Sequence, residues 1–218
     1  VVGGGSWGTT VAHLTAHNAP TVLYTRREDV AAAVNEQHMN PRYLAGYALH
    51  DDLSASTDLA AVVSEADVLV MGVPSSGFRQ TLVEVRPHLR PLIPVVSLAK
   101  GFEVGSRKRM TQLVAEELPG HPVGVLTGPN LAKEILRGSA AAAVLAFVDL
   151  AIAERLQDVV SSDLFRVYSS TDVVGCELGG ALKNVIALAA GMADGLGTGD
   201  NTRAAVMTRG LAEVTRLG

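Results

Sequence analysis

The chain has 218 residues, of which 48% are hydrophobic and 18% charged, and its net charge is −4. This composition excludes a disordered or low-complexity chain, and without a basic stripe the chain lacks the electrostatic surface that nucleic-acid binding needs. No uninterrupted apolar run approaches the roughly 20 residues of a membrane-spanning helix, so we predict no transmembrane segment. The single cysteine, Cys176, is compatible with a reducing compartment, and we expect a cytoplasmic protein.

Short apolar runs alternate with helix-like segments over the first 168 residues. The predicted strands are 1–3, 21–25, 68–73, 95–98, 123–126, 142–147 and 164–168. The predicted helices are 7–17, 28–37, 58–65, 77–88, 106–118, 130–137 and 149–160. Because strands and helices alternate, and several runs are apolar throughout, the pattern predicts an α/β fold with a mainly parallel, doubly wound sheet.

The pattern changes at Asp172, which is typical of a helix N-cap. From there an apolar helix is predicted to about Leu196, and a second helix from about 201 to 217. We therefore predict two domains, 1–171 and 172–218, the second being the start of an all-α domain.

The segment Gly3-Gly4-Gly5-Ser6-Trp7-Gly8 follows an apolar strand and leads into a helical pattern, with another strand after it. In this context the glycine spacing is typical of a dinucleotide-binding loop. Gly3 permits the tight turn, Gly5 lets backbone N–H groups approach a pyrophosphate, and Gly8 allows close packing of helix on strand. The loop predicts a Rossmann-type domain.

An acidic residue at the end of the second strand would mark a preference for NAD, because it accepts hydrogen bonds from the ribose 2′-hydroxyl. This chain has Arg26 and Arg27 there instead. Guanidinium groups suit a 2′-phosphate, so NADP(H) is favoured and NAD(H) is the alternative. Pairing of these arginines with Glu28 or Asp29 at the start of a helix is the competing interpretation.

Further turns follow the carboxyl ends of predicted strands, where ligands of doubly wound sheets bind. Lys100 follows the strand 95–98, and Gly128-Pro129-Asn130 follows the strand 123–126. The turn at 72–76 is expected to line a cofactor. Each turn alone fits a simple connection, but together they indicate a site at one edge of the sheet.

Lys183 lies in the apolar helix that follows Asp172. Its neighbours one turn away are Gly179, Gly180, Ile186 and Ala187, none of them acidic. Burial on such a face would lower the pKa of the ammonium, which favours a general acid or base, whereas a lysine that extends into solvent is the alternative. The six histidines show no metal-ligand spacing, so no metal site is predicted.

The chain resembles the bacterial NAD(P)-dependent glycerol-3-phosphate dehydrogenases. The segments that carry the resemblance are 3–10, 24–27, 40–44, 73–75, 99–101, 128–134, 165–169, 179–184 and 208–213. The resemblance implies reversible hydride transfer between NAD(P)H and dihydroxyacetone phosphate, giving sn-glycerol 3-phosphate for phospholipid synthesis. Members of the family continue for roughly a hundred further helical residues, with a Gly-Asp-Leu and a Ser-Arg-Asn segment that complete the substrate phosphate site.

The resemblance also implies roles for individual residues. The implied cofactor contacts are Ser6, Trp7, Arg26, Arg27, Tyr43, Lys100 and Ala132. The implied substrate contacts are Lys100, Gly128, Asn130 and Lys183. Lys183 resembles the proton acceptor of the family.

Two alternatives to this function stay open: another hydroxyacid dehydrogenase of the same architecture, and a non-catalytic NADP-binding regulator. The presence of both Lys100 and Lys183 argues against the regulator. A homodimer is also open. Because the chain stops before the two family segments that complete the phosphate site, we expect residues 1–218 to bind NADPH but to turn over dihydroxyacetone phosphate poorly.

Overall fold

The computed structural model describes residues 1–217. The strands are β1 (Val22–Tyr24), β2 (Ser54–Ser56), β3 (Leu69–Met71), β4 (Val95–Ser97), β5 (Val123–Thr127), β6 (Ala141–Phe147) and β7 (Phe165–Ser170). The α-helices are α1 (Ser6–Ala16), α2 (Glu28–Gln37), α3 (Leu59–Ser64), α4 (Phe78–Val85), α5 (Met110–Glu117), α6 (Ala132–Leu136), α7 (Leu150–Val160), α8 (Val173–Gly195) and α9 (Gly199–Leu217).

The sheet has two hydrogen-bonded parts. β1 pairs with β2, and the other part has the order β3-β4-β5-β6-β7. The predicted strand at residues 1–3 is reduced to Val2, which forms parallel bridges with Tyr24 and Met71 and so joins the two parts. The sheet is therefore continuous through Val2.

The strand pairs are parallel except for β5 with β6, which is antiparallel. The series of alternating strands and helices predicted a mainly parallel sheet, but not this reversal. Because β6 runs antiparallel to β5, it begins at the edge of the sheet where β5 ends. The connection between them, which contains the short α6, can therefore stay at that edge. Gly124 permits close pairing, because a Cβ there would lie 2.4 Å from the Phe147 ring.

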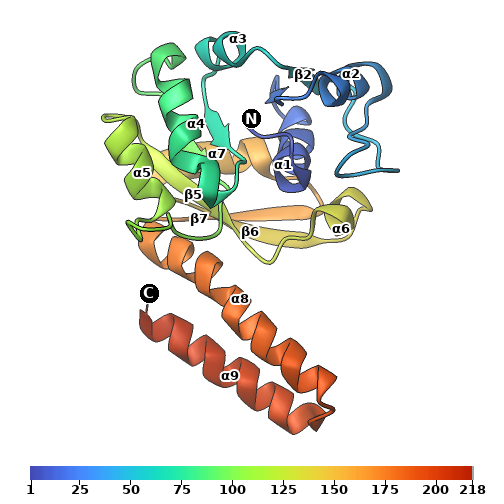
Figure 1. Cartoon of the computed structure of the whole chain (residues 1–218), viewed down its shortest axis with the longest axis vertical. Helices are drawn as coiled ribbons and strands as arrows, with labels where there is room; N and C mark the ends of the chain where they lie inside the picture. The colour runs from blue at the N-terminus through green and yellow to red at the C-terminus, as the bar shows by residue number, and fades with distance from the viewer. Residues whose placement is uncertain (218) are drawn as a thin grey trace.

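Helices cover both faces of the sheet, as the doubly wound pattern predicts (Figure 1). One core cluster joins the strands to α1, α6 and α7, and a second joins them to α3, α4 and α5. Neighbouring residues of one strand face opposite clusters: Leu69 and Met71 lie in the second cluster, and Val70 lies in the first. A third cluster packs α1 and α2 against β1 and β2.

Helix α8 begins where the sequence predicts, since the Asp172 carboxylate accepts a hydrogen bond of 2.8 Å from the Gly175 N–H. Val173 packs against Val125 and Ala146, on the face of β5 and β6. Beyond that contact, α8 and α9 extend from the sheet as an antiparallel pair (Figure 1).

One strand was not predicted, and two helices begin at other residues than predicted. β2 was not predicted, because Ser54-Ala55-Ser56 contains no apolar run. α5 begins at Met110 rather than 106, since residues 101–109 form a loop, and α9 begins at Gly199 rather than 201.

Candidate functional site

The glycine loop has the backbone geometry that its spacing predicts. Gly3 has a φ of 124°, and a Cβ there would lie 2.5 Å from the Gly72 carbonyl oxygen. A Cβ at Gly8 would lie 2.1 Å from the Gly3 carbonyl oxygen. Gly5, by contrast, has nothing within 4 Å of a Cβ position. Packing therefore accounts for Gly3 and Gly8, whereas Gly5 borders open space beside the N-terminus of α1.

Ser6 and Trp7 form the first turn of α1. Ser6 is exposed, and the Trp7 ring packs against Phe165 with centroids 6.3 Å apart. The Trp7 Nε1 is buried without a hydrogen-bond partner in the part of the chain that the structure describes. Because the ring is packed inward, the group that Trp7 presents at the loop is its main-chain N–H.

Asn40 braces the glycine loop, a role that the sequence interpretation did not assign. It is fully buried, and its Nδ2 donates to the Gly4 carbonyl at 3.0 Å and to the Thr9 hydroxyl at 2.9 Å. Its Oδ1 accepts from the Tyr43 N–H at 3.3 Å. Tyr43 itself is 45% exposed. The sequence signals at this position were an asparagine before Pro41 in a segment without periodicity, and the place of that segment, 40–44, among those that carry the family resemblance.

The two arginines after β1 differ in their contacts. Arg27 forms a bidentate pair with Asp29, at 2.9 and 2.7 Å, and this pair raises the pKa of Arg27 and lowers that of Asp29. Arg26 is exposed and has no side-chain hydrogen bond or ion pair within residues 1–217. Arg27 thus has the contact that the competing interpretation expected, and Arg26 is the guanidinium that is free to bind a phosphate.

Lys100 and Gly128 meet at the carboxyl ends of β4 and β5. The Lys100 Nζ donates to the Gly128 carbonyl at 2.8 Å. Partial burial, together with the charge of Lys183, lowers the pKa of Lys100. Gly101 follows with a φ of 147°, and its Cβ position lies 3.3 Å from the Ser75 hydroxyl oxygen. The turns after β3, β4 and β5 therefore converge, as predicted.

Asn130 lies beside this contact and is partly buried. Its Nδ2 donates to the Ala142 carbonyl at 2.8 Å, and its Oδ1 is buried without a partner among the described residues. A Cβ on Gly128 would lie 2.7 Å from that oxygen. Ala132 begins α6 at the same edge.

Lys183 is partly buried, and its Nζ donates to the neighbouring Asn184 Oδ1 at 3.2 Å. α8 reaches the site through Gly180, whose Cβ position lies 2.6 Å from the Thr127 Oγ1 and 3.9 Å from the Lys100 Cγ. The structure thus brings Lys183 to the edge that carries Lys100. The sequence interpretation expected burial to lower the pKa of Lys183. In the structure, burial lowers the pKa of Lys100.

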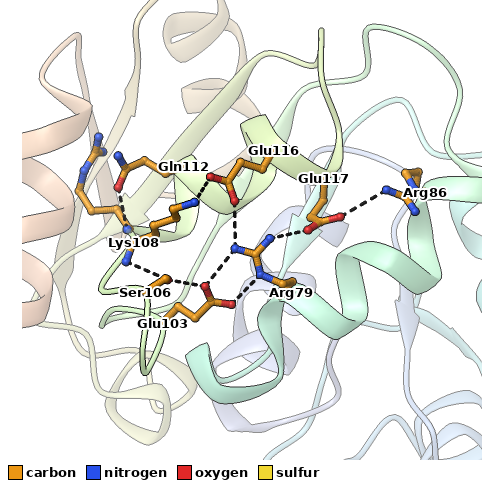
Figure 2. Close-up of polar contacts among 9 residues, drawn as sticks. Arg79, Arg86, Glu103, Ser106, Lys108, Gln112, Glu116 and Glu117 are labelled. Atoms are coloured by element: carbon orange, nitrogen blue, oxygen red, sulfur yellow. Dashed lines mark hydrogen bonds and ion pairs between the residues drawn. The ribbon is translucent and has the colours of Figure 1, made fainter.

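The loop after Lys100 is held by a network of charges (Figure 2). Arg79 of α4 binds Glu103 in the loop and both Glu116 and Glu117 of α5. Hydrogen bonds from Arg79 and Ser106 lower the pKa of Glu103 to about 2. This network joins α4, the loop and α5 into one unit behind the site.

Two other features lie apart from this edge. A cavity of about 640 Å³ is lined mostly by apolar residues, among them Val1, Val22, Val68 and Val160, and by none of the predicted site residues. Within residues 1–217, no three His, Cys, Asp or Glu side chains are grouped to hold a metal ion.

α8 has the length and hydropathy of a membrane-spanning helix, with 23 residues and a mean hydropathy of 1.5 over an 18-residue stretch, although no uninterrupted run indicated it. A single helix of this kind is weak evidence for a membrane span, and 17% of the stretch is buried within residues 1–217. In this fold α8 packs on β5 and along α9.

Comparison with known proteins extends along the whole chain. Residues 1–153 match the family model described as NAD-dependent glycerol-3-phosphate dehydrogenase N-terminus, and residues 172–218 match the corresponding C-terminus model. Glycerol-3-phosphate dehydrogenase [NAD(P)+] 2 of Sphingopyxis alaskensis is 58% identical over 218 residues, all of this chain and 66% of that relative. The Mycobacterium avium enzyme is 53% identical over all of this chain and 64% of its own length.

The fold is also found among solved structures. Glycerol-3-phosphate dehydrogenase from Coxiella burnetii superimposes with a TM-score of 0.90 and 34% identity, over 99% of this chain and 66% of that one. The chain thus spans slightly less than two thirds of the length of these relatives. Since a family model matches most of its residues, the chain belongs to the NAD-dependent glycerol-3-phosphate dehydrogenase family.

Proposed function

We propose that the protein transfers a hydride reversibly between NADP(H) and dihydroxyacetone phosphate, giving sn-glycerol 3-phosphate. The observation that carries this proposal is the convergence of Lys100, Gly128 and Lys183 at the sheet edge that also carries the glycine loop. Names of relatives that are more than half identical support the same reaction.

The residues present fit a dinucleotide. Open space at Gly5 leaves room for a pyrophosphate beside the first-turn amides of α1, and the free guanidinium of Arg26 suits a 2′-phosphate. Asn40 holds this loop in place, and the exposed Tyr43 lies beside it. NADP(H) is therefore our preferred cofactor and NAD(H) the alternative. When bound, it supplies or accepts the hydride at the substrate carbonyl carbon.

Two lysines serve the substrate in this proposal. Reduction of a ketone leaves an oxyanion that must gain a proton, and the Lys183 ammonium donates it; in the reverse direction the neutral amine takes the C2 hydroxyl proton. The Lys100 ammonium, already fixed by the Gly128 carbonyl, orients the substrate from the sheet side. The Asn130 Oδ1, buried without a partner in the described chain, is an acceptor for a substrate hydroxyl.

We further propose a cytoplasmic enzyme that supplies sn-glycerol 3-phosphate for phospholipid synthesis. The lone, partly buried Cys176 suits a reducing compartment. A homodimer is the assembly we propose, although the apolar side chains exposed on α8 and α9 do not argue for it, because the part of the relatives' length that this chain does not span would also cover them.

The test is a spectrophotometric assay of the full-length protein. NADPH absorbance should fall on addition of dihydroxyacetone phosphate and stay constant with a panel of keto acids. Turnover of a keto acid instead would favour another hydroxyacid dehydrogenase. NADPH binding without turnover of any substrate would favour a nucleotide-binding regulator.

A further inference from the structure

Glu177 is a buried carboxylate that the proposed mechanism does not use. Glu177 as a whole is 8% exposed, and its side chain is 6% exposed. Among the buried residues that the structure describes, it is the one with a charged side chain. An isolated buried charge is costly, so its partners indicate what the burial achieves. Glu177 lies in the second turn of α8, on the face that packs against the sheet domain.

The partners of Glu177 all lie at the N-terminus of α5. The Arg109 Nη1 donates to its Oε2 at 2.5 Å, and the Thr111 N–H donates to its Oε1 at 2.9 Å. The Thr111 hydroxyl donates to Oε2 as well. A helix N-terminus favours a negative charge, so both oxygens are satisfied in a favourable field. These contacts fasten α8 to α5.

Arg109 closes the loop that begins at Lys100. The Glu103 N–H donates to the Lys108 carbonyl at 2.9 Å, and Phe102 forms a bridge with Arg109. Behind the loop, Arg79 holds Glu103 together with α5 (Figure 2). Glu177 therefore binds a segment that is already fixed relative to Lys100.

Along α8, Glu177, Gly180 and Lys183 follow one another at intervals of about one helical turn. Gly180 rests against Thr127, with its Cβ position 2.6 Å from the hydroxyl oxygen and 3.9 Å from the Lys100 Cγ. A shift or rotation of α8 would therefore change the distance between Lys183 and Lys100 directly.

We propose that Glu177 is a positioning residue, which acts through Arg109 and Thr111 to hold α8 in the register that places Lys183 opposite Lys100 at the substrate site. The proposal rests on the proposed function for its kinetic consequence. Its geometric part, that Glu177 determines the position of Lys183, does not depend on the proposed function.

The test compares Glu177→Gln with Asp194→Asn. Both variants replace a carboxylate of α8 by its amide and break an ion pair with an arginine, but Asp194 pairs with Arg203 of α9, away from Lys183. In the full-length enzyme, Glu177→Gln should lower kcat at least about tenfold, while the Kd for NADPH stays within about twofold. Asp194→Asn should change neither quantity.

A second measurement needs no turnover. The chain has only four lysines, at positions 100, 108, 133 and 183. Their ¹³C-methylated side chains can be titrated by NMR and assigned with Lys→Arg variants. Burial and then the Lys183 charge lower the pKa of Lys100, so this pKa should rise where the Lys183 charge is displaced, in Glu177→Gln, or removed, in Lys183→Met. It should stay unchanged in Asp194→Asn, and Lys133 on α6 is the internal reference.

If Glu177→Gln does not fold, Thr111→Val removes a single hydroxyl donor and should shift kcat and the Lys100 pKa in the same directions by a smaller factor. A variant that loses thermal stability but keeps the parent kcat and Lys100 pKa would overturn the proposal. Absence of turnover in the parent enzyme would count against the proposed function alone. The Lys100 titration would then still decide the placement of Lys183.

Discussion

The sheet and its flanking helices bury their apolar side chains in clusters on both faces, whereas Leu188 of α8 and Leu211 of α9 are 70% and 68% exposed. The first region carries a complete glycine loop, braced by Asn40 from within the same region. The second carries Lys183, and it meets the first through Glu177 and Gly180. The proposed cofactor half of the site is thus held by its own core, and the proposed proton-transfer half by contacts between the regions.

The largest effect is expected where the second region supplies chemistry. Lys183→Met keeps the aliphatic stem but removes the proton, so kcat should fall at least about 100-fold, within the range of general acid–base catalysis. NADPH affinity should change little, because the glycine loop and Arg26 lie in the first region. Steady-state kinetics and a fluorescence titration measure the two quantities. Near-normal turnover would mean that Lys183 merely extends into solvent.

The next effect is expected in the glycine loop. Gly8→Ala places a Cβ 2.1 Å from the Gly3 carbonyl oxygen, so the free energy of unfolding should fall by roughly 1 to 3 kcal/mol, and NADPH binding with it. Gly5→Ala meets no protein atom within 4 Å and should cost at most about 1 kcal/mol of stability. It should still weaken NADPH binding about tenfold or more, because its methyl group fills the space left for the ligand.

Denaturant unfolding and NADPH titration of both variants separate packing from binding. Unchanged NADPH affinity in Gly5→Ala would contradict the proposal that the cofactor binds beside Gly5.

The sequence was most informative where a function depends on local spacing. The glycine loop, the Asp172 cap and the lysine among small residues of α8 all follow from neighbours within a few positions. The reversal of β6 did not, because a run of apolar residues carries no strand direction. Ser54-Ala55-Ser56 forms a strand only because β1 lies beside it.

The role of Glu177 was equally hidden, because its partner Arg109 lies 68 positions away. The available signal was a single carboxylate in an apolar helix, close to the predicted catalytic lysine. Asn40 gave still less signal of this contact, since its partners Gly4 and Thr9 lie 36 and 31 positions away, before α1 and within it.

A third effect, of similar size to that of Gly8→Ala, concerns cofactor preference within the first region. Replacing Arg26 and Arg27 together with Ala should weaken NADPH binding by about 1 to 3 kcal/mol, the scale of lost contacts to a charged group. Arg26→Ala alone should account for most of this loss, because Arg27 is already paired with Asp29. NADH binding serves as the control and should change little. Equal losses for NADPH and NADH would reject a role at the 2′-phosphate.

The smallest effect is a pH dependence of the free energy of unfolding that arises in the first region alone. His13 of α1 lies beside His17 and His50, and burial, followed by the charges of these two rings, lowers its pKa from 6.5 to about 4. Asp52 lies 3.9 Å from His50. Between pH 6.5 and about 4 the unfolded chain therefore binds a proton that the folded chain does not, so the free energy of unfolding falls as the pH falls.

All six histidines lie in the first region, at positions 13, 17, 38, 50, 88 and 121, so this loss belongs to that region and not to α8 and α9. Allowing for solvent screening of a partly exposed ring, we expect about 1 to 2 kcal/mol. The fluorescence of Trp7, the single tryptophan and a residue of the same helix as His13, reports this unfolding directly. In His13→Gln, whose amide oxygen can still accept from the His50 N–H, the slope between pH 6.5 and about 4 should flatten. An unchanged slope would assign the pH dependence to other groups of the first region.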